Sequence, residues 1–254
     1  MITRLVRGGL AAALAVTTLT TGAALAAPAT AATTTVSGPD VTVTQAGNYP
    51  IFPVDSTNFA VTWKSTGTAD VTGVTRLTVD LPPGLTTDGA LMYSTPYDYT
   101  FSQTVSPDGR RLEAVFTGTR APGRSDFMKV MVRSHGTPPS GVITVTAANK
   151  DDVDPSDNVS RYQLGSGLLP AVTPAAPTVT GTTPGTGPAA GGTAVTISGT
   201  GLTNGFALFG NTPATGSCTA TACTVTAPAG TGSVPVTLVT PGGSAAASSF
   251  TYTP

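Results

Sequence analysis

The densest group of acidic residues in this sequence lies in one short segment. Asp151, Asp152, Asp154 and Asp157 fall within seven residues, and Asn158 follows them. Carboxylates this close repel one another, and a hard cation such as Ca²⁺ would relieve the repulsion through its preference for oxygen ligands. The spacing lacks the glycine and the distal glutamate of an EF-hand loop. A solvated hairpin turn is the alternative, because Asp and Asn accept hydrogen bonds from nearby backbone donors.

A second group of candidate residues is aromatic. Tyr93, Tyr97, Tyr99 and Phe101 occupy odd positions within nine residues. In an extended segment these side chains would share one face, because successive residues of a strand point to opposite sides. A row of tyrosines can stack on sugar rings, so Tyr93, Tyr97 and Tyr99 are candidate ligand-binding residues. The same pattern also fits a core face, or a loop that packs onto the domain.

Cys218 and Cys223 are the only cysteines, with four residues between them. In an oxidising compartment this spacing predicts a disulfide across a short hairpin loop. A redox pair and a zinc site are the alternatives. A redox pair usually has two intervening residues and a nearby base, and zinc needs further ligands, which this part of the sequence does not offer.

The residues needed for acid–base or nucleophilic catalysis are sparse. His135 is the only histidine, in a segment that predicts a strand end and an exposed turn, and no G-x-S-x-G motif is present. From Tyr162 to Pro254 the chain has no Asp, Glu, Lys, Arg or His. That half therefore offers no general acid or base and no carboxylate ligand for a metal. We predict that the protein is not an enzyme and needs no cofactor, with Ca²⁺ as the one candidate ion.

The charge pattern also argues against nucleic acid as a partner. Phosphate binding requires clustered Lys and Arg side chains. Without Arg4 and Arg7 of the N-terminal segment, ten basic residues of the original 12 remain against 13 acidic ones, a formal charge of −3.

The first 32 residues have the layout of a secretory signal peptide. Arg4 and Arg7 precede an apolar run from residue 8 to about residue 27, and small residues follow up to Ala32. We expect cleavage after Ala32; a cut after Ala26 or Ala27 is the alternative, disfavoured by Pro28. A retained membrane anchor is the other interpretation, but threonines interrupt the run and it is short for a span. The mature protein is thus expected to be secreted, without stable membrane insertion, and released or held at the cell surface by its own binding.

The elements that must position these side chains are predicted to be short strands. Val, Thr and aromatic residues favour strands, and the 30 glycines and 22 prolines favour turns. Phe59, Val61 and Trp63 would share a buried face. The first half contains these alternating segments, separated by Pro, Gly and Asp turns: 41–44, 59–64, 76–81, 111–116, 127–133, 141–147 and 159–164. Strands at this spacing predict a β-sandwich.

Two stretches of the first half resemble a known family. "FAVTWKSTGTADVTGVTRLTVDLPPGL" and "VITVTAANKDDVDPSDNVSRYQL" are similar to the bacterial DUF11/CARDB-type extracellular repeats. These repeats have a "lPxGl" turn and a final hairpin with an Asp/Pro/Asn turn. The resemblance covers most of residues 40 to 164 and implies an immunoglobulin-like sandwich. The segment around Tyr97 and Tyr99 departs from the pattern.

The second half resembles the IPT/TIG domain. Gly187-Pro188, Gly191-Gly192-Thr193, Val195-Thr196-Ile197 and Gly199 follow its "GP-x-x-GGT-x-V-T-I-x-G" opening, and "FTY" at 250–252 closes it. The resemblance implies a small immunoglobulin-like sandwich over residues 177–254. Pro235 interrupts a strand there, so we expect it at an edge or a bulge.

The predicted organisation is therefore an all-β chain of two immunoglobulin-like sandwiches in tandem after a signal peptide. The boundaries are 1–32 for the signal peptide, 33–164 for the first domain, 165–176 for a Gly/Pro/Ala-rich linker and 177–254 for the second domain. We expect an extracellular interaction or adhesion module that binds cell-wall glycan or an extracellular protein. A carbohydrate-binding accessory protein, working beside polysaccharide-degrading enzymes, is the alternative. The ligand rests on analogy, because such folds host many functions.

Overall fold

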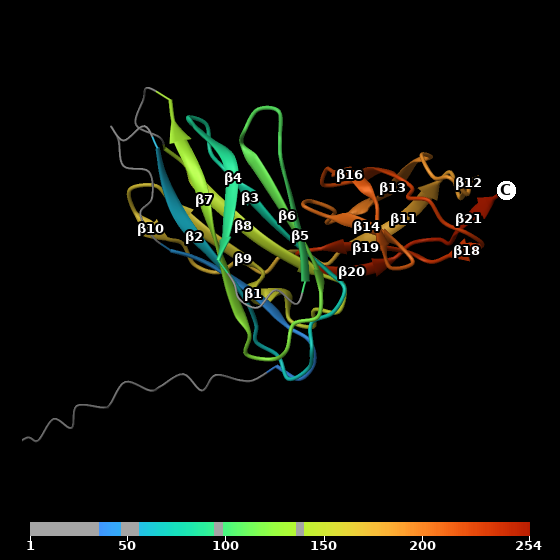
Figure 1. Cartoon of the computed structure of the whole chain (residues 1–254), viewed down its shortest axis with the longest axis horizontal. Coiled ribbons are helices and arrows are strands. Elements are labelled where there is room, and N and C mark those ends of the chain that lie inside the picture. The colour runs from blue at the N-terminus through green and yellow to red at the C-terminus, as the bar shows by residue number, and fades with distance from the viewer. Residues whose placement is uncertain (1–35, 47–55, 94–98, 136–139) are drawn as a thin grey trace, which may run out of the picture. The chain divides into compact units, whose positions relative to one another are not determined.

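The computed structural model describes residues 36–46, 56–93, 99–135 and 140–254. The predicted signal peptide and Tyr97 lie outside these residues. Residues 35–254 form one compact unit, built almost entirely of strands (Figure 1). Within the described residues, no helix has the length and apolar character needed to cross a membrane.

The first half folds into ten strands and one short helix. Their bounds are β1 (Val41–Ala46), β2 (Ser56–Ser65), β3 (Val74–Asp80), β4 (Leu85–Tyr93), β5 (Tyr99–Val105), β6 (Arg111–Gly118), β7 (Ser125–Ser134), β8 (Val142–Asn149), the 3-10 helix η1 (Pro155–Asp157), β9 (Val159–Gln163) and β10 (Gly167–Leu168).

The second half folds into shorter strands. Their bounds are β11 (Thr178–Thr183), β12 (Thr186–Pro188), β13 (Ala194–Thr200), β14 (Phe206–Phe209), β15 (Thr212–Pro213), β16 (Thr215–Cys218), β17 (Ala222–Thr226), β18 (Ser233–Val234), β19 (Val236–Thr240), β20 (Gly243–Ala246) and β21 (Phe250–Thr253).

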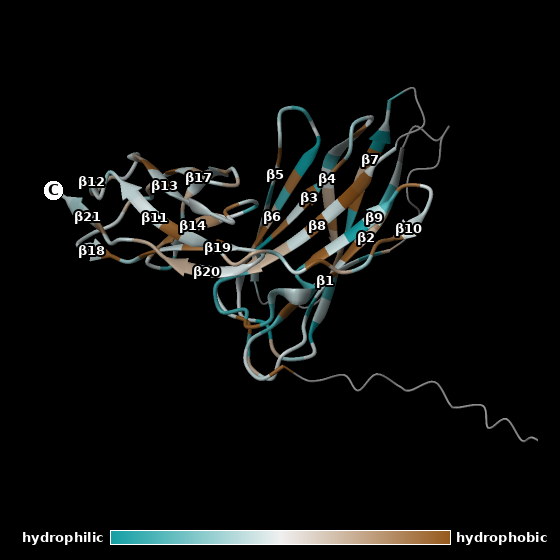
Figure 2. Ribbon diagram, turned by 180° about the vertical axis from the view of Figure 1, so that it is seen from behind, coloured by the Kyte–Doolittle hydropathy of each residue, from teal (hydrophilic) through white to brown (hydrophobic). Residues whose placement is uncertain are grey.

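The first half is a sandwich of two antiparallel sheets, with strand orders β1-β2-β7-β4 and β10-β9-β8-β3-β6-β5. Alternation along the strands builds its core: Phe59, Val61 and Trp63 are all buried, as predicted. The apolar bands of the central strands are visible in Figure 2. Each of the seven predicted segments lies on or overlaps a strand. Strands β4 and β5 were not among the predicted segments. β4 has an irregularity between Thr87 and Gly89 that interrupts its alternation, and β5 lies at a sheet edge with no fully buried residue.

The second half is a smaller sandwich, with sheet orders β11-β13-β17-β16, β15-β14-β19-β20 and β12-β21-β18. Its core includes Val195, Ile197, Phe209 and Phe250. Pro235 separates β18 from β19, which belong to different sheets, so the residue without an N–H lies where the chain changes sheets. The prediction of an all-β chain with two immunoglobulin-like sandwiches is confirmed.

Glycine has a steric role in the motif that opens the second half. Gly191 has φ +79°, and a Cβ at this position would lie 2.6 Å from the backbone nitrogen of Ala229. A side chain would therefore meet both backbone strain and a clash. The close approach allows the Gly192 N–H to donate to the carbonyl of Ala227 at 2.9 Å.

The segment predicted as a linker is partly structured. Residues 167–168 form β10, which pairs with β9, and the two sandwiches contact each other. A third apolar cluster joins Val74 and Ala148 of the first sandwich to Phe206, Leu208 and Val239 of the second. The domain boundaries at 164 and 177 remain predictions, but the halves pack together through buried side chains.

Candidate functional site

A pocket lies where β6 leads into β7. Arg120 forms an isolated antiparallel bridge with Val71. A tight turn follows, closed by the Arg124 N–H donating to the carbonyl of Ala121 at 3.1 Å. The turn brings two arginines, four positions apart, to the same end of the first sandwich.

Arg120 is held by several contacts at once. It is only 3% exposed and forms an ion pair with Asp126, which is 4% exposed. Its guanidinium carbon lies 3.5 Å from the ring centre of Trp63 and 5.2 Å from that of Tyr99. A planar cation between an aromatic face and a carboxylate is fixed in orientation. Arg120 therefore forms a rigid wall.

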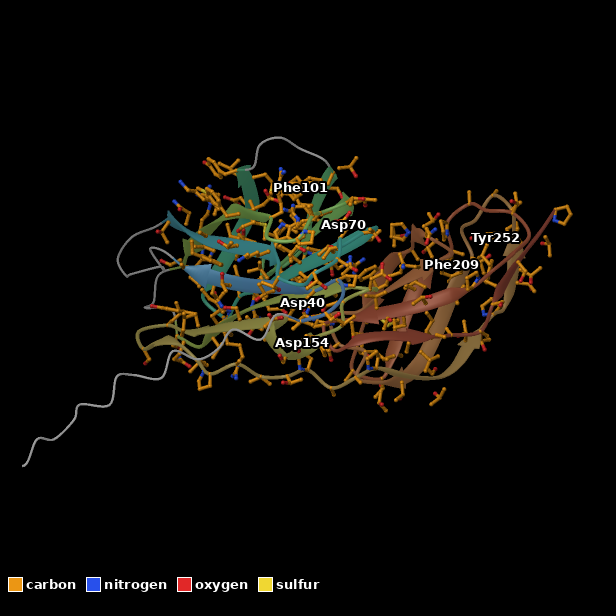
Figure 3. All side chains as sticks on the ribbon, turned by 90° about the horizontal axis from the view of Figure 1, so that it is seen from below. Asp40, Asp70, Phe101, Asp154, Phe209 and Tyr252 are labelled. Carbon is orange, nitrogen blue, oxygen red and sulfur yellow. A yellow bond between two sulfur atoms is a disulfide. The ribbon has the colours of Figure 1, made fainter. Side chains whose placement is uncertain are left out.

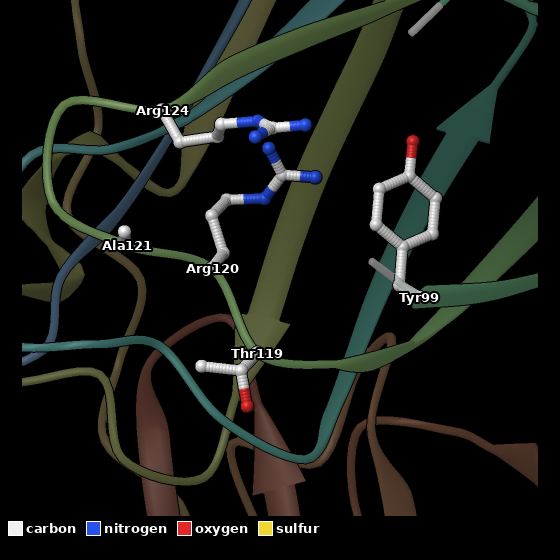
Figure 4. Close-up of a pocket in the computed structure, with 5 residues that line it drawn as sticks. All are labelled: Tyr99, Thr119, Arg120, Ala121 and Arg124. Atoms are coloured by element: carbon white, nitrogen blue, oxygen red, sulfur yellow. The ribbon is translucent and has the colours of Figure 1, made fainter. Parts of the chain in front are cut away.

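The pocket beside this wall has a volume of about 250 Å³ and is lined by Tyr99, Thr119, Arg120, Ala121 and Arg124 (Figure 4). The guanidinium groups of Arg120 and Arg124 extend in the same direction. The Arg124 guanidinium, the Thr119 hydroxyl and the Tyr99 ring are suited to binding a group that carries a carboxylate, because guanidinium N–H groups form paired hydrogen bonds to carboxylate oxygens. The charge of Arg120 is already matched by Asp126. Sequence reasoning missed this site, because no motif links Arg120 to Asp126 and Trp63.

The predicted tyrosine row is not a single face. Tyr93 ends β4 in one sheet and Tyr99 begins β5 in the other. Tyr99 packs inward against Phe116, with ring centres 5.4 Å apart, and Phe101 also packs against Phe116. The interpretation as a core face therefore describes Tyr99 and Phe101, while Tyr93 has a different environment.

Tyr93 belongs to an exposed apolar ridge on the outer face of β4 and β7. Its ring stacks on that of Phe127, the residue opposite it in the register, with centres 5.3 Å apart and planes 3° from parallel. The Lys129 ammonium lies 4.8 Å from the ring centre of Tyr93. Leu91, Tyr93 and Phe127 are 55%, 42% and 38% exposed. We call these three residues the apolar ridge.

The acidic segment is the turn between β8 and β9, as the hairpin interpretation predicted, but its carboxylates do not act together. Asp151 pairs with Lys150 at 2.6 Å. Asp154 accepts a hydrogen bond from the Ser156 N–H at 3.0 Å and caps η1. These two residues of the predicted calcium set thus have local roles.

Asp152 and Asp157 instead interact with Asp40, which precedes β1 and is labelled with Asp154 in Figure 3. Burial raises the pKa of Asp152 to about 7, and the Asp40 carboxylate adds to the rise. Burial also raises the pKa of Asp157 to about 6, again with a contribution from Asp40. Asp40 itself is 1% exposed and accepts a hydrogen bond from the Thr66 hydroxyl at 2.6 Å.

Asp40 could not be recognised as part of this group from the sequence, since only strand pairing brings it to the distant turn. As the side chains stand, no group of three or more His, Cys, Asp or Glu in the described part of the chain could hold a metal ion.

The cysteines and the histidine lie away from the pocket. Cys218 and Cys223 are bonded to each other and face one another across the β16–β17 hairpin, so the predicted disulfide is confirmed. His135 follows β7, is exposed, and its Nε2 lies 2.7 Å from the Thr86 hydroxyl.

Comparison with known families decides the nature of the second sandwich. Residues 177–253 match the IPT/TIG domain family. The predicted IPT/TIG domain is confirmed over this range. The resemblance of residues 40 to 164 to DUF11/CARDB repeats stays a prediction.

Several solved structures are similar to parts of this chain at low sequence identity. A non-cellulosomal cohesin from Archaeoglobus fulgidus is 15% identical, with 52% of this chain and 83% of the cohesin covered and a TM-score of 0.32. Carbohydrate-binding module CBM3b from cellobiohydrolase 9A of Clostridium thermocellum is 15% identical, with coverages of 53% and 98% and a TM-score of 0.29. The major pilin subunit of Bacillus cereus is 11% identical, with coverages of 79% and 58% and a TM-score of 0.34. No curated protein matches the chain.

Proposed function

We propose that this protein is a secreted, non-enzymatic binding module that attaches to a carboxylate-bearing glycan of the cell surface. The observation that carries the proposal is the pocket where Arg120, Arg124, Thr119 and Tyr99 line one cavity. Its volume of about 250 Å³ lies just below the range of roughly 300–1,000 Å³ typical of ligand sites. A single sugar residue fits this size better than an extended chain does.

The roles of the side chains follow from their burial. Arg120 is fixed by Asp126 and Trp63, so it needs no reorganisation when a ligand arrives. Arg124 is half-buried at the pocket and offers donors to a carboxylate. The Tyr99 ring forms an aromatic wall on which a sugar ring can pack, and the Thr119 hydroxyl can exchange hydrogen bonds with sugar hydroxyls.

Binding rather than turnover is the function that this pocket supports. None of the described residues that line it is Asp, Glu or His, whereas glycoside hydrolysis commonly uses a pair of carboxyl groups across the scissile bond. Secretion is supported by the N-terminal residues and by the Cys218–Cys223 disulfide, which is typical of oxidising compartments. An accessory role beside polysaccharide-degrading enzymes would use the same pocket.

The proposal is tested by binding of the secreted protein to polymers that are insoluble or immobilised on beads. We expect retention on polygalacturonate or on peptidoglycan, both of which carry carboxylates, and not on cellulose or chitin. Arg124→Ala should weaken retention by about 10-fold or more, because hydrogen bonds to charged groups contribute about 1.5–3 kcal/mol. Added salt should weaken it too.

Arg133→Ala is the matched control, since Arg133 is exposed and pairs with Asp88 at 2.5 Å on the β4–β7 surface. It removes the same charge and should leave retention unchanged. Equal loss in the two variants, or equal retention on cellulose, would contradict the proposal. The two carboxylate polymers distinguish a uronic acid from the carboxylates of a cell-wall peptide.

Adhesion to a protein is the second candidate function, and the apolar ridge favours it. Aromatic residues are enriched at protein interfaces. Phe127→Ser should then reduce attachment to whole cells, measured by fluorescence of the labelled protein, while polymer retention is unchanged. Unaltered cell attachment in this variant would remove the candidate.

A further inference from the structure

Four buried oxygen atoms of the first sandwich have no hydrogen-bond donor among the described residues. They are Asp40 Oδ1, Asp152 Oδ2, Asp157 Oδ1 and Asn158 Oδ1. Asp40 is 1% exposed and Asn158 is fully buried. Buried polar atoms are nearly always paired, so four orphaned acceptors from one group of side chains require an explanation.

Other polar atoms of these side chains are already engaged, and the side chains of Asn158 and Thr42 also hydrogen-bond to the carboxyl groups of Asp152 and Asp157. The Thr66 hydroxyl donates to Asp40 Oδ2 at 2.6 Å. The Asp154 N–H donates to Asp152 Oδ1 at 3.1 Å. Asn158 Nδ2 donates to the carbonyl of Pro241 at 2.9 Å, so its amide cannot be turned round without losing that bond.

Protonation alone does not satisfy this group. A shared proton can bridge Asp40 and Asp152, but an amide oxygen such as Asn158 Oδ1 does not take up a proton near neutral pH. The unpaired oxygen of Asn158 is thus evidence that does not depend on the acidic residues. Lys150, the positively charged residue next to the turn, is paired with Asp151. Among the described residues, all four oxygens lack a positively charged neighbour, and a cation bound between them would supply one.

We propose that this region binds one Ca²⁺ ion, held by the carboxylates of Asp40 and Asp152 and by the amide oxygen of Asn158. Ca²⁺ takes 6–8 oxygen ligands, including carboxylates, Asn side chains and water, so two carboxylates with neutral oxygens suffice. Asp157 interacts electrostatically with Asp40 and adds negative charge near the site without being one of the ligands. Mg²⁺ fits less well, because it demands near-octahedral geometry and dehydrates reluctantly.

The ligand set differs from the one that the sequence suggests. Asp151 and Asp154 have local partners and lie outside it. Asp40 belongs to it instead, although it lies far from the turn in the sequence. None of these residues lines the arginine pocket. Because Asn158 also bonds to Pro241 of the second sandwich, an ion here would stabilise the junction of the two halves. Extracellular modules bind Ca²⁺ with a Kd of about 10⁻⁴–10⁻³ M, the range expected here.

The test is calcium-dependent thermal stability of the full secreted chain after dialysis against EDTA at pH 7.5. We expect 5 mM CaCl₂ to raise Tm by about 3 °C or more, as ligand linkage predicts for a chain of this size, and MgCl₂ to raise it much less. Isothermal titration with CaCl₂ should give one site per chain. No shift in Tm and no heat of binding would overturn the proposal.

Variants locate the ion. Asp152→Asn should abolish the calcium response while the ion-free protein stays folded, because the change removes a buried charge that repels Asp40. Asp151→Asn and Asp154→Asn are matched controls that should keep the response. A response that survives Asp152→Asn, or is lost in Asp154→Asn instead, would show that these oxygens do not hold the ion.

Discussion

At the scale of single residues, Arg120 decides both the shape and the stability of the arginine pocket. Its guanidinium is enclosed by Asp126, Trp63 and Tyr99, and both members of the ion pair are almost fully buried. Removing one member of such a pair leaves an uncompensated charge in the interior. Arg120 therefore orients the pocket and also contributes strongly to the stability of the first sandwich.

Arg120→Ala should lower the free energy of unfolding by about 3–5 kcal/mol, because Asp126 would remain buried without its partner. Urea unfolding followed by the fluorescence of Trp63, the single tryptophan, measures the loss. Arg133→Ala breaks an exposed pair and should cost at most about 1 kcal/mol. Similar midpoints for the two variants would contradict the assigned role of Arg120.

At the scale of elements, the β16–β17 hairpin shows how a covalent bond supports a short strand pair. β16 is a four-residue strand at the edge of its sheet and its residues are largely exposed. Little apolar burial holds it to β17, so the Cys218–Cys223 bond at the end of the ladder restrains a strand that packing alone secures weakly.

Replacing both cysteines, as in Cys218→Ser with Cys223→Ser, should cost about 2 kcal/mol, the chain-entropy value for so short a loop. Calorimetry should show a lower Tm for the variant, and reductant should lower the Tm of the wild-type protein towards it. A wild-type Tm that does not respond to reductant while the thiols are shown to be free would disprove this contribution.

At the scale of the whole molecule, buried contacts join the two sandwiches. The Arg76 guanidinium lies 4.7 Å from the ring centre of Phe206 and pairs with Glu113 at 3.4 Å. Burial lowers the pKa of Arg76, and Glu113 opposes that change. Arg111 donates to Asn204 Oδ1 at 2.7 Å. A charged face of the first sandwich thus meets a second sandwich that has no charged side chain of its own.

Phe206→Ala should uncouple the halves, because it removes a fully buried ring from the shared cluster and Phe→Ala changes in cores cost about 3–5 kcal/mol. We expect the wild-type protein to unfold in one calorimetric transition and the variant in two. Two resolved transitions in the wild-type protein would show instead that the sandwiches unfold independently.

Features set by residues close together in the sequence could be predicted, and features that depend on distant strands could not. The buried face of Phe59, Val61 and Trp63 followed from alternation, and the cysteine pair from spacing along one hairpin. The tyrosines do not share one face, because Tyr93 and Tyr99 lie in different sheets. Asp151 and Asp154 of the predicted calcium set have neighbouring partners, and calcium binding stays a prediction.

Alternation, turn residues and the IPT/TIG motif act over a few residues, so the amino-acid sequence by itself determined most of the strands, the two sandwiches and the disulfide. The arginine pocket, the pairing of Asp40 with Asp152 and the contact between the halves were decided only by the tertiary structure. Each depends on which distant strands become neighbours, and that choice is set by the packing of the whole core rather than by any local pattern.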